Sequence, residues 1–231
     1  MRMNIARGSL WVAYTLTNRN LMQSMLPPSL KLTACPLLDD DRASLPSPKL
    51  FFNSYRVDSG VLMQGMRTDV LTLGKHRETG ATHLVVLDCI TNTMQWDPIN
   101  GVQFPNARYY HPNKARRRDF ALGIVDKRRQ HRFELRAKRL QERPINEVFA
   151  VEANLACYFQ DADRPFVMTF DNNTIMKPVR QLKPYKLINT YWPCVRSVSP
   201  SHVFCHEHPM AFDVQVSSFL TSHSTLIERT Y

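Results

Sequence analysis

The chain has 231 residues, of which 43% are hydrophobic and 22% charged, and its formal net charge is +10. This length fits one large domain, and the hydrophobic fraction is enough for a real core. No run approaches the roughly 18–20 uninterrupted apolar residues that cross a bilayer, so we expect no transmembrane segment.

The cysteines and the N-terminal charges indicate in which cellular compartment the protein is expected. The five cysteines are an odd number and widely scattered: Cys35, Cys89, Cys157, Cys194 and Cys205. Such a set predicts free thiols in a reducing, intracellular compartment rather than a disulfide framework. The first acidic residue is Asp39, and an arginine-bearing, acid-poor N-terminus is typical of organelle transit peptides. Cytoplasmic and mitochondrial locations therefore both stay open.

The chain begins with strand and helix signals. Residues 10–16 (LWVAYTL) predict a first strand, and folded structure is expected to start near Leu10. Asn18 or Asn20 is expected to cap a short helix that ends at Pro27-Pro28. The residues expected to be buried by this helix are Leu21, Met22, Met25 and Leu26.

Strand signals then follow in quick succession. Residues 74–80 predict a turn with a glycine at each end, and residues 92–113 predict irregular structure. The predicted strands are 50–57, 61–73, 82–91, 120–125, 131–139, 147–159, 166–170, 187–192, 202–206 and 212–218. We therefore expect a mainly β (α+β) fold in a single domain, 1–231, with a core from about 10 to 218.

Most of the positive charge falls in residues 114–143, which hold twelve Lys or Arg against four Asp or Glu, a balance of +8. Two clusters flank the apolar run FALGIV: Arg116, Arg117 and Arg118 before it, and Lys127, Arg128 and Arg129 after it. We predict an exposed basic hairpin whose partner is an acidic or phosphate-bearing macromolecule (a protein, an RNA or an anionic lipid surface). A hairpin that is merely solvated, and a small phosphorylated ligand, are the alternatives.

Motifs of several enzyme classes are missing. The sequence has no Gly-x-Ser-x-Gly, and its seven glycines form neither a Rossmann nor a P-loop fingerprint. His206 and His208 alternate on a predicted strand, but they are half of a zinc site and would need a third ligand such as Cys194. We expect no metal and no cofactor.

Several short motifs resemble a known family in their order and spacing. Leu26–Leu32 (LPPSLKL) is similar to the LPPGLEL motif, and Met66–Val70 (MRTDV) to the VRTYV strand, of an uncharacterised branch of the acetoacetate decarboxylase superfamily. Leu84–Asp88, Gln95-Trp96 and Phe104–His111 follow at about the distances of that branch. The resemblance implies a closed or nearly closed antiparallel barrel with a few short helices and a central cavity.

The family's catalytic lysine pair has no counterpart here. The decarboxylases carry it in a Gly-Phe-Pro-Lys-Lys segment, and the matching segment of this chain is Gln103-Phe104-Pro105-Asn106-Ala107. An amide and a methyl group cannot form the imine on which that chemistry depends. Lys114 lies seven residues further on in a highly charged segment and should stay protonated. We expect no imine-forming decarboxylase, and whether the chain catalyses another reaction stays open.

Two functions fit this combination. In the first, the chain is a pseudoenzyme-like interaction module, an accessory subunit that joins a larger assembly through its basic surface. In the second, the cavity binds a small carboxylate or carbonyl ligand, or serves a lysine-independent enzyme. The candidate ligand-binding residues are then Arg67 for an anion, Gln95 and Asn106 for a carbonyl, and Trp96 and Tyr109 for the wall. A cavity packed shut by Met63, Met66 and Phe104 would favour the module.

Overall fold

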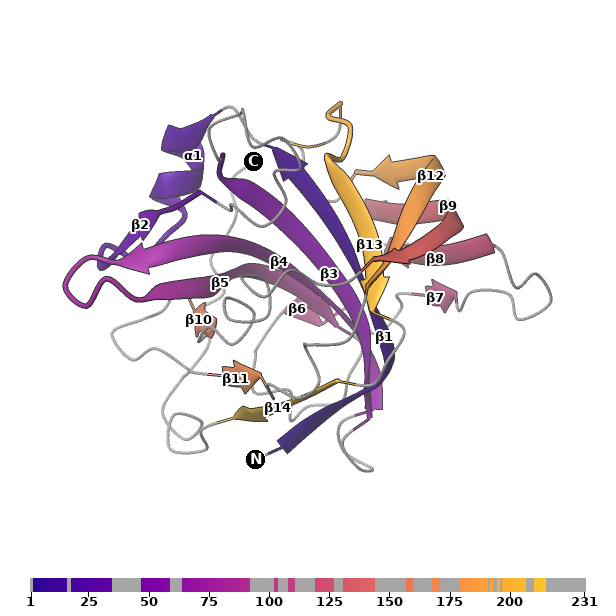
Figure 1. Cartoon of the computed structure of the whole chain (residues 1–231), viewed down its shortest axis with the longest axis horizontal. Coiled ribbons are helices and arrows are strands. Elements are labelled where there is room, and N and C mark those ends of the chain that lie inside the picture. The colour runs from indigo at the N-terminus through magenta and orange to yellow at the C-terminus, as the bar shows by residue number, and fades with distance from the viewer. Residues whose placement is uncertain are drawn as a thin grey trace.

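A computed structural model of the chain shows a long, strongly curved β-sheet with one helix near one end (Figure 1). The structure describes residues 2–15, 18–34, 47–58, 64–91, 102–103, 108–110, 119–126, 131–143, 157–159, 168–170, 179–190, 192, 195, 197–206 and 210–214.

These residues form fourteen strands and one helix. The first part of the chain contains β1 (Arg2–Thr15), α1 (Arg19–Ser24), β2 (Leu30–Leu32), β3 (Lys49–Asp58), β4 (Gln64–His76) and β5 (Thr82–Thr91). The middle contains β6 (Val102–Gln103), β7 (Arg108–Tyr110), β8 (Asp119–Asp126) and β9 (His131–Arg143). The last part contains β10 (Cys157–Phe159), β11 (Met168–Phe170), β12 (Val179–Asn189), β13 (His202–His206) and β14 (Met210–Val214).

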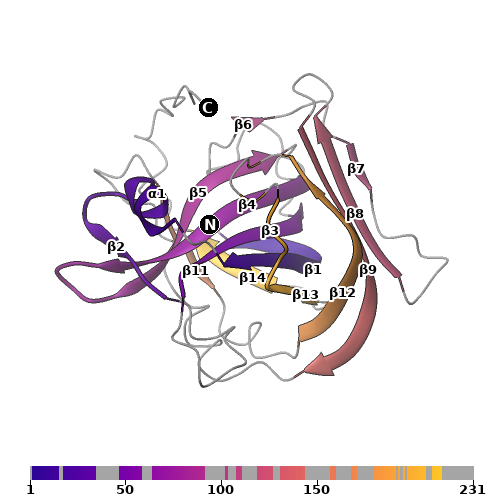
Figure 2. The same cartoon turned by 90° about the horizontal axis from the view of Figure 1, so that it is seen from above.

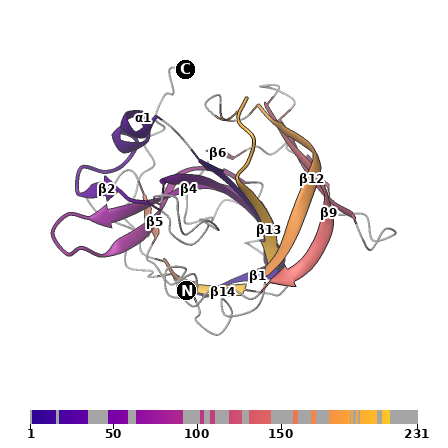
Figure 3. The same ribbon diagram turned by 45° about the horizontal axis from the view of Figure 1, so that its top comes forward.

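The sheet runs in the order β10-β5-β4-β3-β1-β13-β12-β9-β8-β7, with β2 beside β4, β6 beside β5, and β14 between β1 and β11. The mainly β class expected from the sequence is confirmed. Of the closed or nearly closed antiparallel barrel that the resemblance implies, full closure is not present in the described part of the chain, because its strands end at β10 and β7 without a pairing that joins them. In addition, β5 pairs in parallel with both β10 and β6. Figures 2 and 3 show that β12 and β9 continue the curve of the sheet beyond β13.

The curvature brings distant strands together on the concave side. Phe52 on β3 and Phe133 on β9 stack with ring centroids 5.6 Å apart, although β1, β13 and β12 lie between their strands. Because neighbouring strands are about 4.8 Å apart, only a sharply curled sheet allows this contact. Tyr14 meets Phe52 edge-on at 5.7 Å, and burial raises the pKa of its hydroxyl to about 12. The concave side is therefore packed with side chains where these three rings meet.

The central strands are buried on both faces. Residues 9–14 of β1, 49–55 of β3 and 67–73 of β4 are all buried. One face carries the core of Leu10, Val12 and their neighbours, and the opposite face carries Trp11, which stacks on Phe204 at 6.0 Å. Successive side chains of residues 68–73 point to opposite faces of the sheet, and both faces are shielded from solvent.

Several predicted boundaries were wrong in detail. Strand β1 begins at Arg2 rather than near Leu10, because its first part pairs with β14. The strand predicted at 187–192 is the end of β12, which begins at Val179, and the region 92–113 holds β6 and β7. By contrast, β5 has the predicted bounds.

The helix forms where the cap signal predicts it. The side chain of Asn18 accepts a hydrogen bond of 3.1 Å from the backbone N–H of Leu21, which satisfies one of the free donors of the first turn. Met22 and Leu26 are buried as expected, whereas Leu21 is 41% exposed and does not join the core. Only part of the predicted apolar stripe therefore contacts the sheet.

Gly74 lies inside β4, not in the turn predicted at 74–80. A Cβ at this position would lie 3.1 Å from Cγ2 of Val85 and 3.4 Å from Cβ of Leu30. We expect Gly74→Ala to lower the free energy of unfolding by about 1 kcal/mol because the extra methyl overpacks this contact. Combining it with Val85→Ala, which removes the closest atom, should make the methyl itself nearly neutral; urea unfolding of the four proteins in the cycle would show whether the two changes are coupled.

Candidate anion-binding surface

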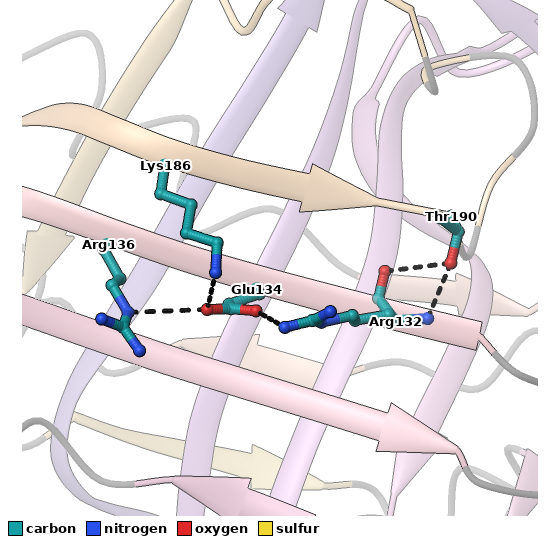
Figure 4. A network of polar contacts seen from close by, with 5 residues as sticks. All are labelled: Arg132, Glu134, Arg136, Lys186 and Thr190. Atoms are coloured by element: carbon teal, nitrogen blue, oxygen red, sulfur yellow. Dashed lines mark hydrogen bonds and ion pairs between the residues drawn. The ribbon is translucent and has the colours of Figure 1, made fainter.

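Four charged side chains meet on the outer, convex face of β9 and β12, and we call them the Glu134 cluster: Glu134, Arg132, Arg136 and Lys186 (Figure 4). Oε1 of Glu134 lies 2.8 Å from Nζ of Lys186 and 3.5 Å from Nε of Arg136, and Oε2 pairs with Nη2 of Arg132. Three cations share one carboxylate, so the cluster keeps a surplus of two positive charges.

The strands fix this geometry. Residues 132, 134 and 136 point to one side of β9 because successive side chains alternate, and the antiparallel register places Lys186 opposite Arg136. At the end of the strand, the hydroxyl of Thr190 accepts a 2.8 Å hydrogen bond from the backbone N–H of Arg132, and the N–H of Thr190 donates to the carbonyl of Arg132 at 2.8 Å. The cluster is therefore held by backbone pairing from two strands (Figure 4).

The positive surface extends beyond the cluster. Lys138 and Lys183 are cross-strand partners on the same side and both are exposed. We call the outer side of β9 and β12 with Arg132, Arg136, Lys138, Lys183 and Lys186 the basic face. Even when Glu134 and Asp119, the cross-strand partner of Lys138, are counted against these five cations, the formal balance is 5 − 2 = +3.

Little stands above these cations on the neighbouring strand. Opposite Arg136 and Glu134, β8 presents Ala121 and Gly123. The long side chains of β9 therefore rise beside a low part of the sheet, and the side chains of Arg132 and Arg136 are 45% and 55% exposed. Guanidinium and ammonium groups held this way are suited to bind phosphate or carboxylate oxygens.

The Glu134 carboxylate is almost covered, with 11% of its side chain exposed. The hydrogen bond from Lys186, followed by the interactions with Arg132, lowers the pKa of Glu134 below its ordinary value of 4.5, against an opposing effect of burial. The carboxylate consequently stays ionised at neutral pH and holds the three cations in place.

This lowered pKa predicts a pH-dependent contribution to stability. At pH 7 we expect Glu134→Gln to lower the free energy of unfolding by about 0.5–1 kcal/mol. The effect is this small because solvent screens the partly exposed cations and so weakens each ion pair. A group with a depressed folded-state pKa stabilises the fold above its unfolded value near 4.5, and that contribution is lost as pH falls through the folded value. The difference between wild type and variant should therefore shrink in urea unfolding below pH 4.5. A difference that stays constant from pH 7 to pH 3 would contradict it.

A second polar group lies on the convex face of β3 and β4, but it is buried. Nε of Arg67 lies 2.6 Å from Oδ1 of Asp69, and the hydroxyl of Tyr55 donates a 2.7 Å hydrogen bond to Oδ2 of the same carboxylate. The side chain of Arg67 is 0% exposed and that of Asp69 4%. The alternation of β4 and the register with β3 place Tyr55 opposite Arg67.

Only some of the predicted site residues lie in the part of the chain that the structure describes. Arg67, expected to meet a ligand anion, is paired with Asp69. The backbone of Tyr109 lies in β7 and pairs with Ile124, and its side chain is outside what the structure describes. The predicted positions outside the described residues are Gln95, Trp96, Asn106, Arg116, Arg117, Arg118, Lys127, Arg128 and Arg129, together with Met63 and Phe104 of the expected cavity wall.

Part of the basic hairpin is visible. Strands β8 and β9 pair in antiparallel register from Asp119 opposite Lys138 to Asp126 opposite His131. Sequence reasoning missed the contribution of β12, whose Lys183 and Lys186 lie outside the 114–143 stretch. The sequence shows the charges of Lys183 and Lys186, but it does not reveal their pairing with β9.

Three further properties concern the described residues. Cys205 is buried, at 3% exposure. Within the described ranges no three His, Cys, Asp or Glu side chains gather as they would around a metal ion. In the same part of the chain, no helix combines the length and apolar character needed to cross a membrane.

The curved, mainly β sheet defines the class of fold, and comparison with solved structures identifies it. The chain has an acetoacetate decarboxylase-like fold. It is similar to the acetoacetate decarboxylase of Legionella pneumophila, with a TM-score of 0.56 and 12% identity over 93% of this chain and 87% of the other. It is also similar to the enduracididine biosynthesis enzyme MppR, with a TM-score of 0.56 and 10% identity over 93% of this chain and 86% of the other. No protein-family model matches the sequence, and no curated protein matches it significantly.

Proposed function

We propose that this chain uses an acetoacetate decarboxylase-like fold as an interaction module, an accessory part of a larger assembly that binds an acidic or phosphate-bearing macromolecule. The observation that carries the proposal is the basic face, where three cations share Glu134 and two more lie beside them. Such an excess of exposed positive charge repels itself unless solvent or an anionic partner screens it.

Two features weigh against an imine-forming decarboxylase. Asn106 and Ala107 stand where the resemblance expects two lysines. Among the described residues, the rings of Phe52, Phe133 and Tyr14 pack on the concave side, where contacts at 5.6 and 5.7 Å bridge β1, β3 and β9. A chain of this kind retains the fold as a scaffold while its outer strands carry the binding surface.

A second function rests on the buried Arg67. A fully buried guanidinium is costly to maintain and is suited to hold a carboxylate. Asp69 already supplies that carboxylate at 2.6 Å, so a ligand anion would have to share or displace it. This makes small-molecule binding the weaker proposal.

Native mass spectrometry of the full chain isolated from its source distinguishes the two functions. The module proposal expects a complex with a macromolecule that dissociates when salt is raised, and expects the variant R132Q/R136Q/K186Q to lose it. A bound mass of a few hundred daltons that resists salt and disappears in Arg67→Met would support ligand binding and contradict the module.

A further inference from the structure

The basic face also carries an exposed aromatic ring. Tyr185 is 57% exposed and lies between Pro184 and Lys186, where the register between β12 and β9 shifts. Pro184 and Lys186 both keep partners on β9, so Tyr185 is the extra residue of a bulge, and its exposure places the ring in solvent rather than in the core that Leu182 joins. A β-bulge redirects a side chain in this way.

Cations flank Tyr185 along β12, and their cross-strand partners on β9 are cations as well. Lys183 precedes it opposite Lys138, and Lys186 follows it opposite Arg136. Alternate residues of a strand are about 6.6 Å apart, so the cations of β9 from Arg132 to Lys138 form a row about 20 Å long. That row offers repeated phosphate contacts, with the aromatic ring beside it.

The combination indicates the kind of partner. An acidic peptide or an anionic lipid surface would bind the cations and contact the ring through apolar groups, but neither presents flat faces at regular spacing for the ring to stack on. A duplex presents phosphates, but its bases are stacked inside. A single-stranded polynucleotide offers both phosphates for the cations and unstacked bases for the ring.

On the basis of the proposed function, we infer that the basic face binds a single-stranded polynucleotide, RNA or DNA. The phosphates of the polynucleotide contact the cations of β9 and β12, and one of its bases stacks on Tyr185. Stacking adds affinity for every base because each has a π-face, so this recognition is tolerant of sequence.

Fluorescence anisotropy of the full chain with labelled 15-nucleotide oligouridine and oligodeoxythymidine, and with labelled inorganic polyphosphate as a probe without bases, tests the inference. We expect Tyr185→Ala to weaken oligonucleotide binding at least fivefold, and Tyr185→Phe to stay within about twofold of wild type, because the ring and not the hydroxyl stacks. Polyphosphate affinity should be the same in all three proteins. Tighter binding of oligouridine would indicate contacts to the 2′-hydroxyl, and equal binding would indicate phosphate and base contacts alone; both support the inference.

The remaining outcomes separate this inference from the function on which it rests. If Tyr185→Ala weakens polyphosphate and oligonucleotide equally, the ring only positions the cations and the inference is overturned. If wild type binds polyphosphate but no oligonucleotide, the inference fails while the proposed function stands. If it binds neither, and native mass spectrometry finds no salt-sensitive complex with a macromolecule, the proposed function fails as well.

Discussion

Replacing Asp69 by alanine is expected to lower the free energy of unfolding by about 3–5 kcal/mol, since it leaves the guanidinium of Arg67 buried without its carboxylate. The hydroxyl of Tyr55 would lose its acceptor at the same time. Chemical unfolding monitored by circular dichroism, with a matched Glu142→Ala variant, measures the effect. Glu142 pairs with Arg180 at the surface, so its removal should cost less than about 1 kcal/mol.

A variant that lacks both buried charges shows how much of the expected loss in unfolding free energy comes from leaving Arg67 without Asp69. The double variant R67M/D69L should be more stable than Asp69→Ala alone, because apolar side chains of similar size need no partner. If Asp69→Ala and Glu142→Ala have equally small effects, Arg67 has another compensating anion, and the account of this pair is wrong.

The second large effect concerns binding. We expect R132Q/R136Q/K186Q to lose about 100-fold in affinity for inorganic polyphosphate at 0.1 M salt, because three phosphate contacts with a salt slope of about 0.7 each are removed. Its free energy of unfolding should fall by about 1 kcal/mol, because it breaks the same three ion pairs as Glu134→Gln, and binding is compared under conditions where both proteins are folded. The control variant K31Q/R56Q/K75Q removes the same charge from exposed positions elsewhere and should bind nearly as wild type does.

Local patterns in the sequence predicted much of the secondary structure. The strand-length apolar run Leu84–Leu87 located β5, and Asn18 followed by apolar residues located the helix start. These features depend on neighbours in the chain, such as a side chain that caps the next turn. The mainly β class followed from the same kind of signal.

Long-range pairing could not be predicted in this way. Nothing local in Phe52 or Phe133 shows that the sheet curls enough for them to stack, and nothing in the 114–143 stretch shows that Lys186 pairs with Glu134. Arg67 was identified as a candidate site residue, but the partnership with Asp69 two positions away depends on the burial of that face. Register and curvature decide these contacts, and both arise from the whole sheet.

The most direct test of the central claim is the salt dependence of polyphosphate binding by the full chain, measured from 50 to 200 mM salt. If the basic face binds through phosphates, the logarithm of the association constant falls linearly with the logarithm of salt concentration, and R132Q/R136Q/K186Q has a slope smaller by about 2 than that of wild type and of K31Q/R56Q/K75Q. A slope that is the same in all three proteins would place the binding elsewhere and contradict the assignment of the Glu134 cluster.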